Sequence, residues 1–129
     1  MKKASGFTVI ELVVVIVFLG FASILLLYQK NNIQASQRDE ARKTAINAMY
    51  YNLEEVFYEK NSYYPASIDS KTLRAMDPEL FTDPNGNKLG DPNSDYRYDG
   101  IDCENDHCKS YKLISRLEKE ADYIKTNRN

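Results

Sequence analysis

A few small groups of residues in this 129-residue chain carry side chains that could do chemistry. One is a lone carboxylate, Glu11, inside an apolar run. The others are a row of oxygen donors within 83–95, the cysteine pair Cys103 and Cys108, and a single histidine, His107. A carboxylate in apolar surroundings needs a cation as its partner. A run of oxygen-bearing side chains can bind Ca²⁺, and two nearby cysteines can form a disulfide or bind a metal.

These groups do not form a catalytic constellation. The sequence has neither a G-x-S-x-G nucleophile elbow nor a phosphate-binding glycine loop. The acidic pairs Glu54–Glu55 and Glu118/Glu120 are typical of solvated faces rather than of acid–base pairs. The sequence therefore predicts a protein that is not an enzyme and that uses no cofactor.

The two cysteines bracket a short acidic segment. In an exported domain, Cys103 and Cys108 most simply form one disulfide that closes a hairpin. Because the enclosed loop is short, chain entropy assigns the bond roughly 2 kcal/mol. A zinc site that uses both cysteines and His107 is the alternative, although this spacing matches no common structural zinc pattern.

Oxygen-bearing side chains dominate the turn-rich stretch between Asp83 and Asp95. The calcium candidates among them are Asp83, Asn85, Asp91 and Asp95. Two segments, 83–87 and 91–95, have the alternating oxygen ligands of an EF-hand loop. The glycine that should follow each of them is missing, since Lys88 and Tyr96 occupy those positions. Because Asp, Asn, Gly and Pro are also what turns require, a metal-free turn region is the simpler interpretation and a calcium site the alternative.

The segment that carries Glu11 is strongly apolar. Residues 7–28, FTVIELVVVIVFLGFASILLLY, contain one charge and no proline. As a helix they would span roughly 33 Å, enough for a hydrocarbon core about 30 Å thick. The run is too long for a signal peptide and has no small-residue cleavage site at its far end, so we expect a retained membrane anchor. Lysines and arginines flank both ends, so charge alone does not orient it.

The overall charge limits the classes of partner. The chain has 17 Lys+Arg against 19 Asp+Glu, a net charge of −2. A basic nucleic-acid-binding protein is therefore disfavoured. A one-domain cytosolic enzyme with a large core is also disfavoured, because much of the apolar content lies in one linear segment.

A helical pattern continues beyond the apolar run. Its apolar stripe consists of Ile46, Met49, Leu53, Val56 and Phe57. No proline or glycine stands between Phe21 and Tyr64, so the sequence predicts one helix from about Phe7 to about Lys60. Its second half, 29–60, is amphipathic and suited to packing on a small domain.

Residues 61–129 are predicted to form a small globular head. The helix ends before Pro65, and Asp69 is the expected N-cap of a short helix over 69–76. Alternating tyrosines predict a strand at 96–98, and 111–118 is predicted as a second strand, with a helix as the alternative. No structure is predicted for 119–129. The fold class is therefore α+β, a long N-terminal helix packed on a small antiparallel sheet.

The chain has ten tyrosines and no tryptophan. We expect Tyr50-Tyr51 and Tyr63-Tyr64 to roof the small core with their hydroxyl groups in water. Contact with a sugar, a surface or DNA is the alternative.

The N-terminal residues resemble the prepilin peptidase motif of type IV pilins and pseudopilins. Lys2-Lys3 and Ser5-Gly6 precede Phe7-Thr8-Val9-Ile10-Glu11-Leu12 and the apolar run. The resemblance covers residues 2–28. It implies a pilin-like fold, a leader peptide over 1–6, cleavage between Gly6 and Phe7 on the cytoplasmic side, and N-methylation of Phe7.

The same resemblance assigns roles in assembly to Glu11 and Gly20. It implies that Glu11 of one subunit neutralises the new α-amine of Phe7 on its neighbour, which removes two unpaired charges from a low-dielectric filament core. Gly20 stands where the family commonly has a glycine, in a region that can lose helicity in filaments. Many members also have a proline near the position of Tyr28, which helps the helix to unwind. This chain has no proline there, so Gly20 alone would promote the loss of helicity.

The resemblance implies a structural subunit of a type IV pilus or pseudopilus, polymerised through its N-terminal helix. Its partners would be other pilins, a prepilin peptidase, an assembly ATPase and a membrane platform. It would cross the cytoplasmic membrane once with its head outside, then join an extracellular or periplasmic filament. Motility, adhesion, DNA uptake and secretion all use such filaments, and the sequence does not choose among them. The alternative is a monomeric, signal-anchored extracytoplasmic protein whose head binds a ligand or metal.

Overall fold

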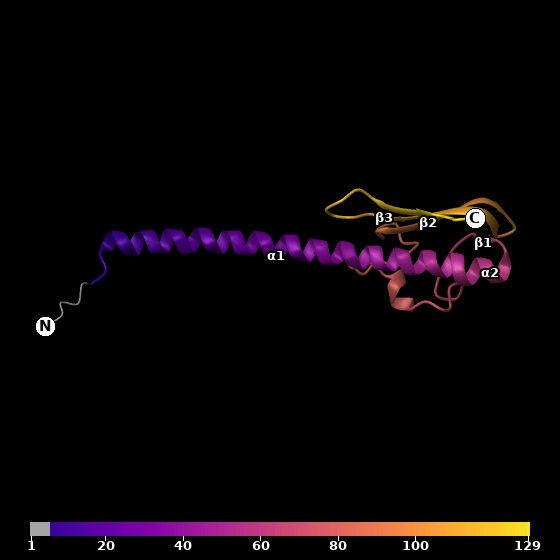
Figure 1. Ribbon diagram of the computed structural model, residues 1–129, viewed down its shortest axis with the longest axis horizontal. Helices are drawn as coiled ribbons and strands as arrows, with labels where there is room; N and C mark the ends of the chain where they lie inside the picture. The colour runs from indigo at the N-terminus through magenta and orange to yellow at the C-terminus, as the bar shows by residue number, and fades with distance from the viewer. Residues whose placement is uncertain (1–5) are drawn as a thin grey trace. The chain divides into compact units, whose positions relative to one another are not determined.

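A computed structural model describes residues 6–129, so Lys2, Lys3 and Ser5 of the expected leader lie outside the described part. Helix α1 (Val9–Tyr51) continues through a π-helical turn, η1 (Asn52–Phe57), into α2 (Tyr58–Asn61). The strands β1 (Tyr64–Pro65), β2 (Tyr96–Glu104), β3 (His107–Ser115) and β4 (Tyr123–Thr126) follow. Figure 1 shows α1, α2 and the first three of these strands. The predicted long helix is confirmed. The chain divides into two compact units at Gln34 and Ala35.

The N-terminal unit is an apolar helix that the described chain leaves uncovered. Its large side chains are open to solvent, for example Phe18 at 75% and Leu26 at 67% exposure. This helix is long and apolar enough to cross a membrane. Packing within the described chain therefore does not account for its hydrophobicity.

The C-terminal unit, Ala35–Asn129, combines the second part of the helix with a small antiparallel sheet. Strand β3 lies at the centre, with β2 on one side and both β1 and β4 on the other. Tyr96 lies opposite Ser115 and Tyr98 opposite Leu113. The predicted α+β architecture is confirmed, and the segment around Tyr111 is a strand rather than a helix. It ends at Ser115 instead of Glu118, and the tail adds β4.

The core lies between the helix and the sheet. Ala45, Ile46, Met49 and Leu53 are buried on the helix, and Tyr64, Tyr111 and Leu113 are buried opposite them. Val56 and Phe57 are only half-buried. The π-helical turn has more residues per turn than an α-helix, so it rotates Asn52–Glu54 toward the core instead.

Glu54 is buried, which corrects the expectation that it lies on a solvated face. It is 2% exposed. Its carboxylate accepts hydrogen bonds from the Tyr111 hydroxyl at 2.8 Å, the Tyr64 hydroxyl at 3.1 Å and the Arg128 N–H at 3.0 Å. Burial raises the pKa of Tyr64 to about 12, and the contact with Glu54 adds to that rise. Glu54 thus joins the helix, the sheet and the C-terminal tail.

The predicted helix over 69–76 is wrong, because the segment forms turns. Asp69 does accept hydrogen bonds from the backbone N–H groups of Lys71 and Thr72, as an N-cap would. Leu73 and Met76 are both drawn into the core, and the N–H of Met76 donates to the carbonyl of Leu73 in a tight turn. Pro78 then starts a short 3₁₀-helix, η2 (Pro78–Phe81).

Strands β2 and β3 meet in a tight hairpin. Asn105 and Asp106 both have positive φ, 50° and 66°, which is the signature of a two-residue type I′ turn. Cys103 and Cys108 lie opposite each other and form the predicted disulfide. Both sulfurs are therefore bonded to each other, which contradicts the zinc alternative.

Gly100 makes room for that disulfide. A Cβ atom on Gly100 would lie 2.7 Å from Cys108 Sγ and 3.3 Å from the backbone Cα of Ala66. Neither neighbour is the free end of a flexible side chain, so a larger residue at this position forces the hairpin to shift.

We predict that Gly100→Ala destabilises the C-terminal unit by about 1–3 kcal/mol, the usual cost of overpacking. Thermal unfolding of the full chain in detergent measures the loss. Gly20→Ala is the control, because a Cβ there meets nothing within 4 Å. Equal unfolding temperatures for Gly100→Ala and the wild type would contradict this packing.

Candidate functional site

The N-terminal candidate site is organised around Glu11 in the first turn of α1. The N–H of Thr8 donates to Glu11 Oε2 at 2.9 Å and the Thr8 hydroxyl donates to the same oxygen at 3.0 Å. In return, the N–H of Glu11 donates to Thr8 Oγ1 at 3.4 Å. This reciprocal arrangement is a capping box, and Thr8-x-x-Glu11 was the sequence signal that could have identified it.

The capping box occupies only part of the carboxylate. Both Thr8 bonds go to Oε2, and Oε1 accepts no hydrogen bond from the described residues. Both donors are neutral, so the charge of Glu11 has no counterion within residues 6–129. A cation from another molecule could bind there.

The other predicted assembly residues lie in open surroundings. Gly6 and Phe7 precede the helix, and Phe7 is 83% exposed. Gly20 is helical, with nothing within 4 Å of the position of a Cβ. Packing in the single chain therefore does not require glycine there, while glycine weakens a helix interior by about 1 kcal/mol relative to alanine.

In the C-terminal unit, three carboxylates converge on a guanidinium, and only one of them, Asp95, belongs to the oxygen-rich stretch 83–95. Arg42 of α1 is 1% exposed. It donates to Asp39 Oδ1 at 2.9 Å, to Glu118 Oε1 at 3.0 Å, and to Asp95 Oδ2 at 2.9 and 3.2 Å. Arg38 donates two more hydrogen bonds to Glu118. We call these five residues the Arg42 cluster.

Two carboxylates of the Arg42 cluster, Glu118 and Asp39, have pKa values below their ordinary values. The hydrogen bonds from Arg38 lower the pKa of Glu118 to about 2; burial opposes this shift, and Arg42 adds to it. Burial alone would raise the pKa of Asp39. The backbone N–H groups of Glu118 and Lys119, together with Arg42, outweigh burial and hold that pKa below its usual value. Glu118 is exposed, as expected, and its carboxylate pairs there with Arg38 and Arg42.

Asp83 organises the turn that precedes β2. It is buried, and its carboxylate accepts from the backbone N–H groups of Asn85, Asn87 and Asp95 at 2.8–2.9 Å. Burial acts to raise the pKa of Asp83, but these three donors outweigh it and lower the pKa. A carboxylate held in this way has its oxygens directed at N–H groups.

The structure brings three of the four calcium candidates together. Asn85 donates through its amide to Asp95 Oδ2 at 3.0 Å, next to Asp83. Asp91 belongs to the following turn and accepts from the N–H of Lys88 at 3.1 Å. Protein donors bond to both oxygens of Asp83 and to Oδ2 of Asp95, and no metal-binding group of three His, Cys, Asp or Glu is found in residues 6–129. Arg42 supplies the positive charge that a calcium ion would bring.

Several tyrosines belong to the core. Tyr64, Tyr96 and Tyr111 are buried, and the Tyr98 hydroxyl donates to the carbonyl of Pro65 at 2.7 Å. The rings of Tyr64 and Tyr111 meet edge to face with centroids 4.8 Å apart. The expected roof with hydroxyl groups in water is therefore wrong for Tyr64, whose hydroxyl donates to the buried Glu54, and for Tyr51, which is 61% exposed.

No family model, curated protein or solved structure matches this chain. The fold and the sites define its class: an α+β protein with a disulfide-closed hairpin and an uncovered apolar N-terminal helix that is long enough to cross a membrane.

The Arg42 cluster predicts acid sensitivity. Because the pKa of Glu118 is about 2 in the folded protein against an ordinary value of 4.5, its stabilisation is complete above about pH 4.5 and is lost as the pH falls toward 2. The unfolding temperature of the full chain should therefore fall less over this range in Glu118→Gln than in the wild type.

Glu59→Gln is the control for acid sensitivity, because Glu59 is exposed and outside the Arg42 cluster. This variant should keep the full wild-type dependence on pH. If the unfolding temperatures of the wild type and Glu118→Gln fall equally between pH 4.5 and 2, the Arg42 cluster does not stabilise the fold.

Calcium should leave the unfolding temperature of the full chain unchanged, because backbone N–H groups occupy both oxygens of Asp83 and Arg42 occupies Oδ2 of Asp95. Calorimetry with Ca²⁺ and then with a chelator measures this. A rise of the unfolding temperature with Ca²⁺ that the chelator reverses would contradict the conclusion that Arg42 takes the place of a calcium ion.

Proposed function

We propose that this chain is a structural subunit of a type IV pilus or pseudopilus, processed between Gly6 and Phe7 and polymerised through residues 7–28. The observation that carries the proposal is the uncovered apolar helix with one carboxylate, Glu11, in its first turn. The leader residues and the glycine before Phe7 supply the processing motif.

The hydrophobic effect requires a partner for this helix. Burying one large apolar side chain is favourable by about 1.5–3 kcal/mol, and residues 7–28 expose many of them. Lipid can cover them before assembly, and the same segments of neighbouring copies can cover them afterwards. Both environments fit a subunit that is stored in a membrane and then transferred to a filament.

Glu11 distinguishes a polymerising helix from a simple anchor. An ionised carboxylate within a membrane helix costs on the order of 2–3 kcal/mol on insertion scales. The capping box gives this charge neutral donors only. Cleavage after Gly6 would create an α-amine at Phe7, and the Phe7 amine of an adjacent subunit fits the open oxygen Oε1.

The C-terminal unit would be the part that a filament displays outside the membrane. It combines the disulfide, the Arg42 cluster and the Glu54 contacts, which hold a small core together. Assembly of such a subunit requires a prepilin peptidase, an assembly ATPase and a membrane platform. The proposal does not need catalysis by this chain.

A monomeric, signal-anchored protein is the second candidate, and the capping box favours it. Thr8 gives Glu11 two hydrogen bonds without a neighbouring subunit. In that case residues 7–28 serve only as a tether, and Gly6 has no role.

We predict that the mature protein begins at methylated Phe7, because the Gly6–Phe7 bond is in the position of the scissile bond. Mass analysis of the purified chain from cells with an active prepilin peptidase measures the N-terminus. An intact Met1 would support the tethered monomer and contradict the filament proposal.

A second prediction separates the charge of Glu11 from its capping role. Glu11→Gln keeps a residue that can complete the capping box but removes the charge, so filaments should be lost while the chain remains in the membrane. Thr8→Val weakens the capping box and keeps the carboxylate, so filaments should persist.

Electron microscopy of surface filaments and membrane fractionation measure both outcomes. Glu59→Gln is the matched control, because it removes an exposed carboxylate elsewhere on the helical segment. Normal filaments from Glu11→Gln would contradict the proposed pairing with Phe7.

A further inference from the structure

Strand β2 has a free edge. Among residues 6–129 it pairs with β3 alone, whereas β3 is paired along both edges. A strand of nine residues, Tyr96–Glu104, therefore leaves one row of backbone groups without a strand partner. Such an edge is a template for pairing with another chain.

The register identifies which backbone groups face outward. The N–H of Arg116 donates to the carbonyl of Asp95 at 2.9 Å, which marks these two as a hydrogen-bonded pair. Because such pairs alternate in an antiparallel ladder, Arg97 and Asp99 also bond to β3, and the backbone groups of Tyr98 and Gly100 point away from it.

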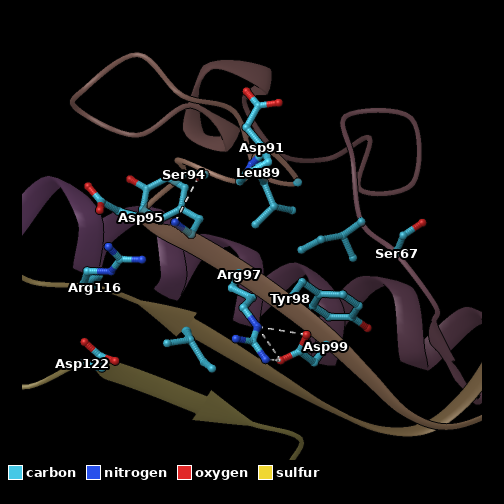
Figure 2. A pocket seen from close by; sticks show the side chains of 15 residues that line it. Ser67, Leu89, Asp91, Ser94, Asp95, Arg97, Tyr98, Asp99, Arg116 and Asp122 are labelled. Atoms are coloured by element: carbon cyan, nitrogen blue, oxygen red, sulfur yellow. Dashed lines mark hydrogen bonds and ion pairs between the residues drawn. The ribbon is translucent and has the colours of Figure 1, made fainter.

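A groove runs beside this edge. It has a volume of about 540 Å³, and Figure 2 shows Leu89 and Ser67 on its far side and Arg97, Tyr98 and Asp99 along β2. Ile68 adds an apolar wall. The groove therefore gives another extended segment access to the backbone of Tyr98.

The side chains on the outer face of this edge carry opposite charges. Arg97 Nη2 lies 2.8 Å from Asp99 Oδ2, and the two side chains are 71% and 37% exposed. In one molecule they pair with each other. Both remain accessible to a second molecule.

We propose that the β2 edge binds the β2 edge of a second copy of this chain, antiparallel, about a two-fold axis at Tyr98. In this register Tyr98 faces Tyr98 of the second copy, and Tyr96 faces Gly100. Arg97 then lies opposite Asp99 of the other copy, twice by symmetry. The interface is self-complementary in hydrogen bonding and in charge.

The neighbouring registers are unfavourable by charge. Residues whose backbone N–H and C=O groups point out of the edge must face each other across the interface. One strand can therefore shift against the other only in steps of two residues. One slip places Arg97 opposite Arg97, and the other places Asp99 opposite Asp99. Like charges directly opposite destabilise a strand pair, and opposite charges stabilise it. The order Arg97-Tyr98-Asp99 thus selects the symmetric register and the identical partner.

Cross-linking tests this register directly. Directly opposed residues in a non-hydrogen-bonded pair have Cα atoms about 4.5 Å apart, which a disulfide can span. Full-length Arg97→Cys and Asp99→Cys chains, mixed in detergent and mildly oxidised, should cross-link to each other. Arg97→Cys mixed with Lys112→Cys on β3 is the negative control. Association through the apolar helix alone would not select the first pair over the control.

Charge exchange tests the same interface without cysteines. Arg97→Asp should lower the dimer fraction of the full chain on the order of tenfold, because two attractive pairs become repulsive. The exchanged variant Arg97→Asp/Asp99→Arg should restore it. Both variants change exposed side chains, and unfolding temperatures verify that they fold.

A specific cross-link together with restored dimerisation would support the proposal. Equal cross-linking of the control pair, or a charge-exchanged variant that stays as weak as Arg97→Asp, would overturn it. Neither result depends on cleavage after Gly6 or on filament formation, so this proposal and the filament proposal can fail separately.

Discussion

The exposed apolar side chains of the N-terminal helix are the constraint on which the rest of this protein depends. No described part of the chain covers them, so the protein requires lipid or further copies around that segment. A helix satisfies its own backbone hydrogen bonds and can therefore enter either environment. Glu11 is the one charge in this segment, and its capping box with Thr8 leaves one carboxylate oxygen open.

The C-terminal unit solves a different problem, the stability of a small core. Arg42 is buried among Asp39, Asp95 and Glu118, and these carboxylates come from the helix, the loop before β2 and the segment after β3. Removing one partner from such a cluster leaves an uncompensated charge, which typically costs 3–5 kcal/mol. Glu54 makes a second set of links at the far end of the same helix. Charge and hydrogen bonding thus complement a thin hydrophobic core.

Local patterns predicted the long helix, its Ile46–Met49–Leu53 stripe, the strand around Tyr111 and the disulfide, because periodicity, missing helix breakers and cysteine spacing are properties of short segments. The burial of Glu54, the turns at 69–76 and the Arg42 cluster depend on contacts across the fold. Asp69 caps as expected, but the segment that follows forms turns in which Leu73 and Met76 are buried. Asp83 and Asp95 suggested calcium because the sequence does not show that Arg42 reaches them. The assembly roles of Gly6, Phe7 and Gly20 stay predictions from the resemblance.

The most direct test of this account is an electron cryomicroscopy structure of the native filament that resolves the N-terminal helices. We expect the α-amine of Phe7 in one subunit to lie within about 4 Å of the Glu11 carboxylate of its neighbour, the distance of an ion pair. A filament in which Glu11 contacts only its own Thr8, with the Phe7 amine elsewhere, would contradict the central claim.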